Sequence, residues 1–167
     1  MIEMTVAGIA LDAATRAPIV LLRDTTDRRA LPIWISQEQA RAIMFALERQ
    51  APPRPLTHDL LVNMLQQWEM TLERIVIHSL QDSTFFAVLK IRRGEEFKEI
   101  DARPSDAIAL ALRLDAPIWV MEEVVADASI PVNHEADEQE REAFRDFLSG
   151  LNPSDFIHNK ERSQPES

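Results

Sequence analysis

Two acidic side chains and an arginine stand close together at the expected start of a helix. Asp101, Arg103 and Asp106 fall within six positions, directly before a run that is apolar on every face. Carboxylate oxygens are the ligands that Mg²⁺ and Mn²⁺ prefer, and a guanidinium neutralises phosphate charge. We therefore predict that all three are catalytic, that Asp101 and Asp106 hold a divalent cation, and that Arg103 binds phosphate. The alternative is structural, because acids at helix starts gain about 0.3 to 1 kcal/mol from the dipole and Arg103 can pair with Asp101.

A second cluster again places Arg-Pro and then an acid at the start of a helix, which is expected from about residue 57. Arg54 is followed by proline, and His58 and Asp59 come next. A histidine can act as general base near neutral pH, while Asp59 could orient it or bind metal, and Arg54 could bind phosphate. Neighbouring residues on a helix do not face each other, so His58 and Asp59 form a pair only where the backbone is not yet helical. The alternative is a solvated surface histidine.

Glu38 completes the predicted catalytic set. It lies in the first turn of a helix that starts after Ser36, where Ser36 and Gln39 have the spacing of a capping box. Its alternative role is a surface acid that compensates the helix dipole. The three tryptophans are expected to fill the core, with stacking on a nucleic acid base as the alternative, and they are Trp34, Trp68 and Trp119.

The composition excludes several kinds of site. The chain has no cysteine, so it offers no disulfide framework, thiolate metal site or cysteine nucleophile. Its three glycines cannot form a phosphate-cradling loop, so no nucleotide cofactor is expected. No long apolar segment or signal-like N-terminus occurs, and we expect a soluble cytoplasmic protein with no membrane association.

The charge is unevenly distributed. The 18 basic and 28 acidic residues give a formal net charge of −10, which argues against a broad phosphate-binding surface. Residues 134–167 hold nine acids and four bases, a net of −5, so residues 1–133 carry the other −5. Half of the acidity therefore belongs to the last fifth of the chain.

The hydrophobic pattern predicts an α+β fold with a mixed or antiparallel sheet. Two β-β-β-α-like units are expected, over residues 1–50 and 71–114, with an additional helix between them. Thr57 is expected to cap that helix, and Leu60, Leu61, Met64, Leu65 and Trp68 form its apolar stripe. Residues 117–125 are expected to return as a further strand.

The chain divides into three parts by composition. Residues 1–133 are expected to form the folded domain, and residues 134–151 an acidic amphipathic C-terminal helix. Its apolar face would consist of Phe144, Phe147, Leu148 and Leu151. Residues 152–167 are polar, and we expect a disordered tail there.

Three segments resemble the bifunctional nuclease family. They are Leu-Pro-Ile-Trp-Ile-Ser-x-Glu-Gln-Ala at 31–40, Arg-Pro-Leu-Thr-His-Asp-Leu at 54–60 and Asp-Ala-Arg-Pro-Ser-Asp-Ala-Ile-Ala-Leu-Ala-Leu-Arg at 101–113, in the family's order and spacing. The resemblance implies a compact α+β domain with nuclease activity on DNA and RNA, but it supplies no catalytic mechanism. Its segments contain all seven residues selected above: Glu38, Arg54, His58, Asp59, Asp101, Arg103 and Asp106.

Two hypotheses follow. The first is a nuclease with nucleic acid as substrate, in which Asp101 and Asp106 hold the cation, Arg54 or Arg103 stabilises phosphate charge, and His58 activates water. The second is a non-catalytic binding or regulatory protein that uses the same polar clusters as an interface. A homo-oligomer is also expected, because many apolar faces need to be covered. If the clusters lay far apart, or were paired and sealed from solvent, the predicted nuclease site could not exist.

Overall fold

The computed structural model describes residues 1–150, except for eight side chains of the C-terminal helix (residues 134–137, 140, 144, 147 and 148). The described residues fall into two units, residues 1–132 and residues 133–150. The predicted tail and the predicted apolar face at Phe144, Phe147, Leu148 and Leu151 lie outside the described residues. Within residues 1–150, none of the helices combines the length and apolar character needed to cross a bilayer.

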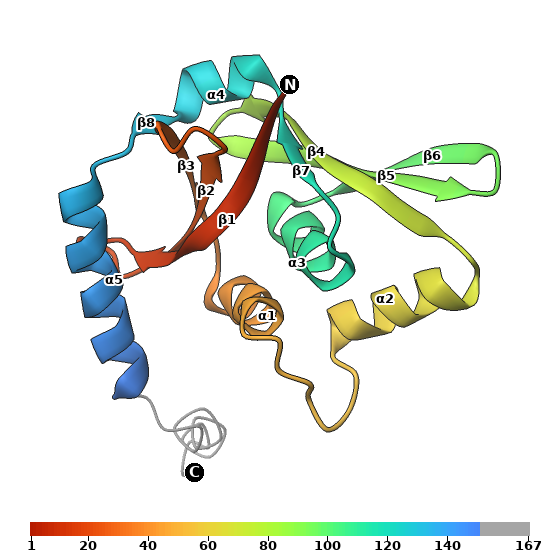
Figure 1. Cartoon of the computed structure of the whole chain (residues 1–167), viewed down its shortest axis with the longest axis horizontal. Coiled ribbons are helices and arrows are strands. Elements are labelled where there is room, and N and C mark those ends of the chain that lie inside the picture. The colour runs from red at the N-terminus through yellow and green to blue at the C-terminus, as the bar shows by residue number, and fades with distance from the viewer. Residues whose placement is uncertain (151–167) are drawn as a thin grey trace, which may run out of the picture. The chain divides into compact units, whose positions relative to one another are not determined.

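The elements follow the chain in a simple order, which Figure 1 shows in colour. The first unit consists of β1 (Ile2–Leu11), β2 (Pro18–Asp24), β3 (Arg29–Trp34), α1 (Gln37–Leu47), α2 (Thr57–Gln67), β4 (Thr71–Gln81), β5 (Thr84–Arg93), β6 (Glu96–Ala102), α3 (Pro104–Leu114), β7 (Ile118–Val120), α4 (Glu122–Ala128) and β8 (Ile130–Pro131). The second unit contains α5 (His134–Ser149).

The strands form one mixed sheet, so the predicted α+β class is confirmed. Its strand order is β6-β5-β4-β7-β1-β2-β3-β8, and every neighbouring pair is antiparallel except β4 and β7, which are parallel. The meander β1–β3 is followed by α1, and the meander β4–β6 by α3, with α2 between them. Strand β7 returns after α3 and joins the two meanders in the middle of the sheet.

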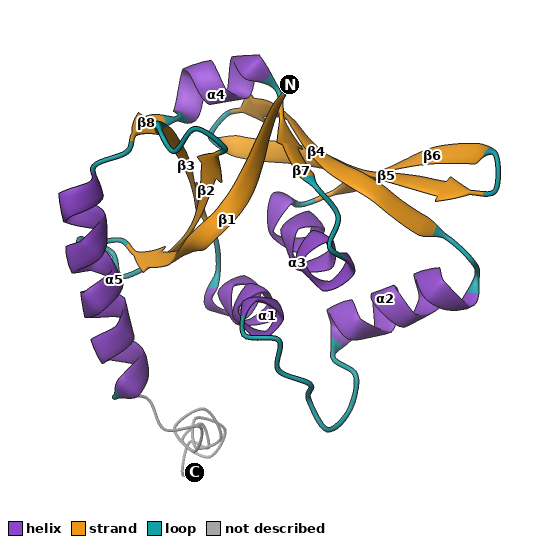
Figure 2. Ribbon diagram, viewed as in Figure 1, coloured by secondary structure: helices purple, strands orange, loops and turns teal. Residues whose placement is uncertain are grey.

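Helix α3 lies at the centre of the core. Five consecutive residues, 107–111, are buried, which is the pattern predicted for a helix covered on several sides. It packs against α1, α2, β4 and β5. On β4 the consecutive residues Ile75, Val76 and Ile77 are all buried, so both faces of the sheet are covered there. Figure 2 shows α3 on one side of this strand and α4 on the other.

The start of α1 forms as predicted. Ser36 Oγ accepts a hydrogen bond from the Gln39 backbone N–H at 3.2 Å, and Gln39 Oε1 accepts from the Ser36 N–H at 2.8 Å. The two side chains therefore satisfy backbone donors that an uncapped helix would leave open.

Two local expectations were wrong. The strand expected over residues 117–125 is only three residues long, since helix α4 begins at Glu122. Glu122 and Glu123 occupy the first turn, where acids are favoured, and Val124 and Val125 are buried together. Thr57 is already helical and does not cap α2; the carboxylate of Asp59 instead accepts a hydrogen bond from the Leu56 N–H at 2.9 Å.

The expected burial of the tryptophans was also wrong in two of three cases. Trp34 and Trp68 are exposed, while Trp119 is half-buried. Trp34 retains a polar partner, because its Nε1–H donates to Asp12 Oδ2 at 3.0 Å. Of the five residues predicted to form the apolar stripe of α2, only Leu65 is half-buried and the others are exposed.

Candidate functional site

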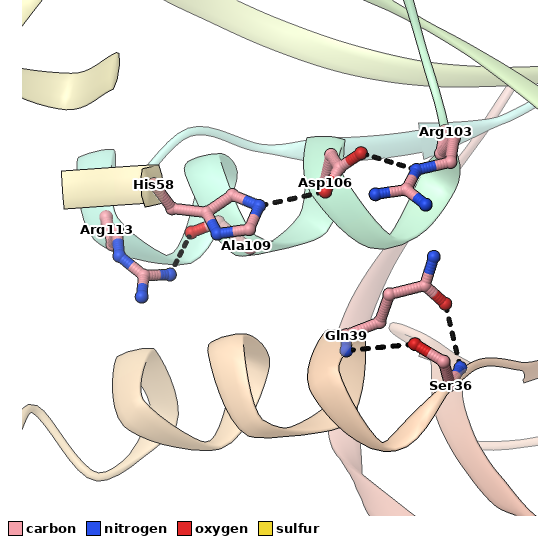
Figure 3. A network of polar contacts seen from close by, with 7 residues as sticks. All are labelled: Ser36, Gln39, His58, Arg103, Asp106, Ala109 and Arg113. Carbon is pink, nitrogen blue, oxygen red and sulfur yellow. Dashed lines mark hydrogen bonds and ion pairs between the residues drawn. The ribbon is translucent and has the colours of Figure 1, made fainter. Parts of the chain in front are cut away.

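The starts of α2 and α3 meet through a histidine and an aspartate that are 48 residues apart in the chain. His58 Nε2 lies 2.9 Å from Asp106 Oδ1, and Arg103 Nε donates to Asp106 Oδ2 at 2.7 Å. Figure 3 shows the imidazole and the guanidinium approaching the same carboxylate from opposite sides. We refer to His58, Arg103 and Asp106 as the polar cluster.

The polar cluster is paired but remains open to solvent. The side chain of His58 is 15% exposed, that of Asp106 29% and that of Arg103 67%. Burial opposes ionisation of Asp106, but hydrogen bonds from Arg103 and His58 outweigh it and hold the pKa of this carboxyl below its ordinary value. Asp106 is therefore a carboxylate at neutral pH, with a histidine and an arginine beside it that solvent can reach.

A second bridge connects the same two helices. Arg113 Nε donates to Asp59 Oδ1 at 3.0 Å, and Arg113 Nη1 donates to the Ala109 carbonyl at 2.9 Å. Burial works against ionisation of Asp59, but the hydrogen bonds from the Leu56 N–H and Arg113 lower the pKa of its carboxyl. Asp59 therefore binds Arg113 and caps α2, while His58 takes Asp106 as its partner.

Arg113 is the site residue that the sequence did not reveal. It follows Asp106 by seven residues, so both lie on one face of α3 about 10 Å apart along its axis. That spacing was visible in the sequence, but an arginine in the last turn of a helix also has an ordinary role beside the helix dipole.

The remaining predicted residues form no hydrogen bond or ion pair with the polar cluster. Glu38 is exposed in the first turn of α1, and Arg54 is exposed in the loop before α2. Asp101 is exposed on β6 opposite Val88 of β5. Its side chain therefore lies on one face of the sheet, and the side chain of the buried Leu89 lies on the opposite face. Within the described residues, none of these three side chains makes a hydrogen bond or ion pair.

In the polar cluster, the carboxylate that was predicted to bind a cation is already paired. Both oxygens of Asp106 already have partners in His58 and Arg103. Among the side chains that the structure describes, no group of three or more histidines, aspartates and glutamates is arranged to hold a metal ion. The cation predicted at Asp101 and Asp106 therefore stays a prediction.

A pocket of about 350 Å³ lies beside the Asp59–Arg113 bridge, between α1, α2 and α3. Phe45, Gln50 and Asn63 line it together with both residues of the bridge. The pocket and the polar cluster therefore share no lining residue, although both lie against α2 and α3.

Comparison with known proteins decides the family. The model of the bifunctional nuclease domain matches residues 20–133, which is more than half of the 167 residues and includes all seven predicted site residues. The chain belongs to the bifunctional nuclease domain family. The family match also spans both bridges between α2 and α3, since Asp59 and Arg113 lie within it.

Two kinds of relative were found. An uncharacterized protein of Mycobacterium tuberculosis is 41% identical over 164 residues, which cover 92% of this chain and 97% of that protein. Bifunctional nuclease 1 of Oryza sativa subsp. japonica is 26% identical over 124 residues, which cover 72% of this chain and 38% of the rice protein. The match to the rice protein therefore concerns one part of a longer chain.

Protonation of Asp59 and Asp106 should lower the stability of the protein at acidic pH. Because their folded-state pKa values are lowered, their contribution is complete above the unfolded value of about 3.9 and disappears as pH falls through the lower folded values. We expect the free energy of unfolding, measured with urea at a series of pH values, to drop below about pH 4.

The matched control for this prediction is the double variant Asp59→Asn/Asp106→Asn. It should show a shallower drop, because the remaining carboxyl groups titrate in both proteins. Equal slopes in the two proteins would contradict the assignment of these two pKa shifts.

Proposed function

We propose that this protein is a nuclease that hydrolyses phosphodiester bonds of DNA or RNA at the polar cluster. The observation that carries the proposal is the contact between the His58 ring and an ionised Asp106, open to solvent and adjacent to Arg103. Membership of the bifunctional nuclease domain family and the similarity to a rice protein named bifunctional nuclease 1 support it.

The contact determines which ring nitrogen of His58 carries a proton. An ionised carboxylate can only accept hydrogen bonds, so Nε2 of His58 carries the proton in the contact with Asp106. In the neutral ring the other nitrogen, Nδ1, then holds the lone pair, and no hydrogen bond engages it within the described residues. We propose that Nδ1 takes the proton from the attacking water while Asp106 stabilises the imidazolium that forms.

Arginine side chains would bind the substrate phosphate. Arg103 uses Nε for Asp106 and is two-thirds exposed, so its two terminal nitrogens can donate to phosphate oxygens. Arg54 is exposed in the loop that leads into α2, four residues before His58. In a chain with a net charge of −10, attraction of phosphate has to come from such local groups.

Assistance by Mg²⁺ or Mn²⁺ is a separate proposal, centred on Asp101. Its carboxylate is exposed and makes no hydrogen bond or ion pair among the described residues. Mg²⁺ commonly binds through one or two carboxylates, with substrate phosphates and water completing its shell, so one exposed aspartate suits it. Asp106 could join as a second ligand only by giving up its bond to Arg103.

The alternative function is non-catalytic binding or regulation. The observation that favours it is the mutual pairing of the charges, which would also arise if the bridges served only to hold α2 on α3. A cleavage assay with single variants separates the two, because a purely structural bridge predicts changes in stability without any activity to lose.

His58→Gln should remove cleavage while leaving the fold intact. Glutamine can retain a hydrogen bond to Asp106 but cannot accept a proton from water, so we expect the rate to fall roughly 100-fold to 10,000-fold. Hydrolysis of single-stranded DNA and RNA by purified protein measures the effect. His78→Gln is the matched control, because His78 is exposed on β4, its Nδ1 is hydrogen-bonded to Ser79 and its ring lies beside Phe86. Undiminished cleavage by His58→Gln would exclude His58 as the base.

Chelation should lower the cleavage rate, and added Mg²⁺ or Mn²⁺ should restore it, if Asp101 holds a cation as proposed. Asp101→Asn should then need a higher metal concentration for half-maximal cleavage, because one charged ligand is lost. The assay compares wild type and variant across a metal titration. A full rate in chelator would refute the metal proposal and leave the role of His58 standing.

A further inference from the structure

Helix α2 is attached to the domain without a buried side chain. Its half-buried residues are His58, Asp59, Val62 and Leu65, which recur at helical spacing and define the face towards the domain. Two of these four are the polar residues that bridge to α3. The apolar content of α2 is therefore mostly on the opposite face.

That opposite face is a stripe of large apolar side chains. Leu60 is 54% exposed, Leu61 40%, Met64 48% and Trp68 61%, and their spacing places them along one side of the helix. An aromatic side chain of this kind can bury roughly 150 to 250 Å², so the stripe amounts to a few hundred Å². This is comparable to the largest apolar patch of an ordinary monomer, and such patches often mark interaction sites.

The chemistry of the stripe identifies the kind of partner. Helix α2 contains no lysine or arginine, and its one acid, Asp59, faces the domain. A helix that lies on a membrane normally carries basic residues beside its apolar face, so a lipid surface does not suit it. A second copy of the chain does, because a neutral face lets two chains of charge −10 approach without repulsion at the contact.

We propose that α2 packs against α2 of a second copy about a two-fold axis, forming a homodimer. An isologous contact brings the same stripe from both chains together, and leucine and methionine at three- and four-residue spacing provide the ridges and grooves of helix packing. With a polar surround, two such stripes fit the apolar centre of a standard interface, which buries roughly 800 Å² per partner.

The oligomeric state of the full chain tests the proposal. Sedimentation velocity at micromolar concentration should give the mass of two chains for the wild type and of one chain for Leu61→Glu/Trp68→Glu. Circular dichroism checks that the variant keeps its fold. Ile130→Glu is the matched control, since Ile130 is an equally exposed apolar residue on β8, at the far edge of the sheet. This control should remain a dimer.

Cysteine cross-linking tests the geometry without disturbing the fold, because the chain has no cysteine of its own. Single variants Leu61→Cys and Met64→Cys should form a covalent dimer on mild oxidation, since residues near the two-fold axis come within the roughly 7 Å that a disulfide spans. Ile130→Cys should stay monomeric on a non-reducing gel.

Three results would overturn the proposal. They are a monomeric wild type, a dimer that survives Leu61→Glu/Trp68→Glu, and cross-linking no greater than for Ile130→Cys. If the wild type is monomeric and the cysteine of Met64→Cys does not react with a thiol reagent, residues 133–167 of the same chain would be the segment that covers the stripe. None of these readouts depends on cleavage, so the outcome is independent of the proposed nuclease activity.

Discussion

The start of α2 is held to α3 by two polar bridges, His58 to Asp106 and Asp59 to Arg113. An isolated helix of eleven residues is marginal in water, and α2 has no buried residue to anchor it. The position of α2 therefore depends on ionised aspartates and their partners. The same bridges place the His58 ring on the Asp106 carboxylate, so the stability of this helix and the geometry of the proposed site rest on the same interactions.

The sequence predicted the parts of the site that depend on local structure. Polar residues before α2 and α3 marked both helix starts, and the apolar run after Asp106 predicted the buried centre of α3, because both signals lie within one or two turns of chain. Adjacent residues on a helix do not face each other, and this argued against the prediction that His58 pairs with Asp59. The sequence did not show that His58 pairs with Asp106, because these residues are 48 positions apart and meet only where α2 packs on α3.

The errors have a related physical cause. Periodicity indicated that α2 is amphipathic, but it could not tell whether the apolar or the polar side faces the domain. The structure turns the polar side inward, because His58 and Asp59 find partners on α3, and this leaves Met64 and Trp68 exposed. Likewise, a short apolar run such as the one from residue 117 onward is compatible with either a strand or a buried helix. Glu122 and Glu123 lie in the first turn of α4, where acids favour a helix.

The central claim is that His58 and Asp106 act as one catalytic unit in phosphodiester cleavage. A double-mutant cycle on the cleavage rate, with His58→Gln, Asp106→Asn and the double variant, tests it most directly. Because residues that act as a unit are not additive, the double variant should be no slower than His58→Gln alone. Losses that multiply in the double variant, or full activity in Asp106→Asn, would contradict the account.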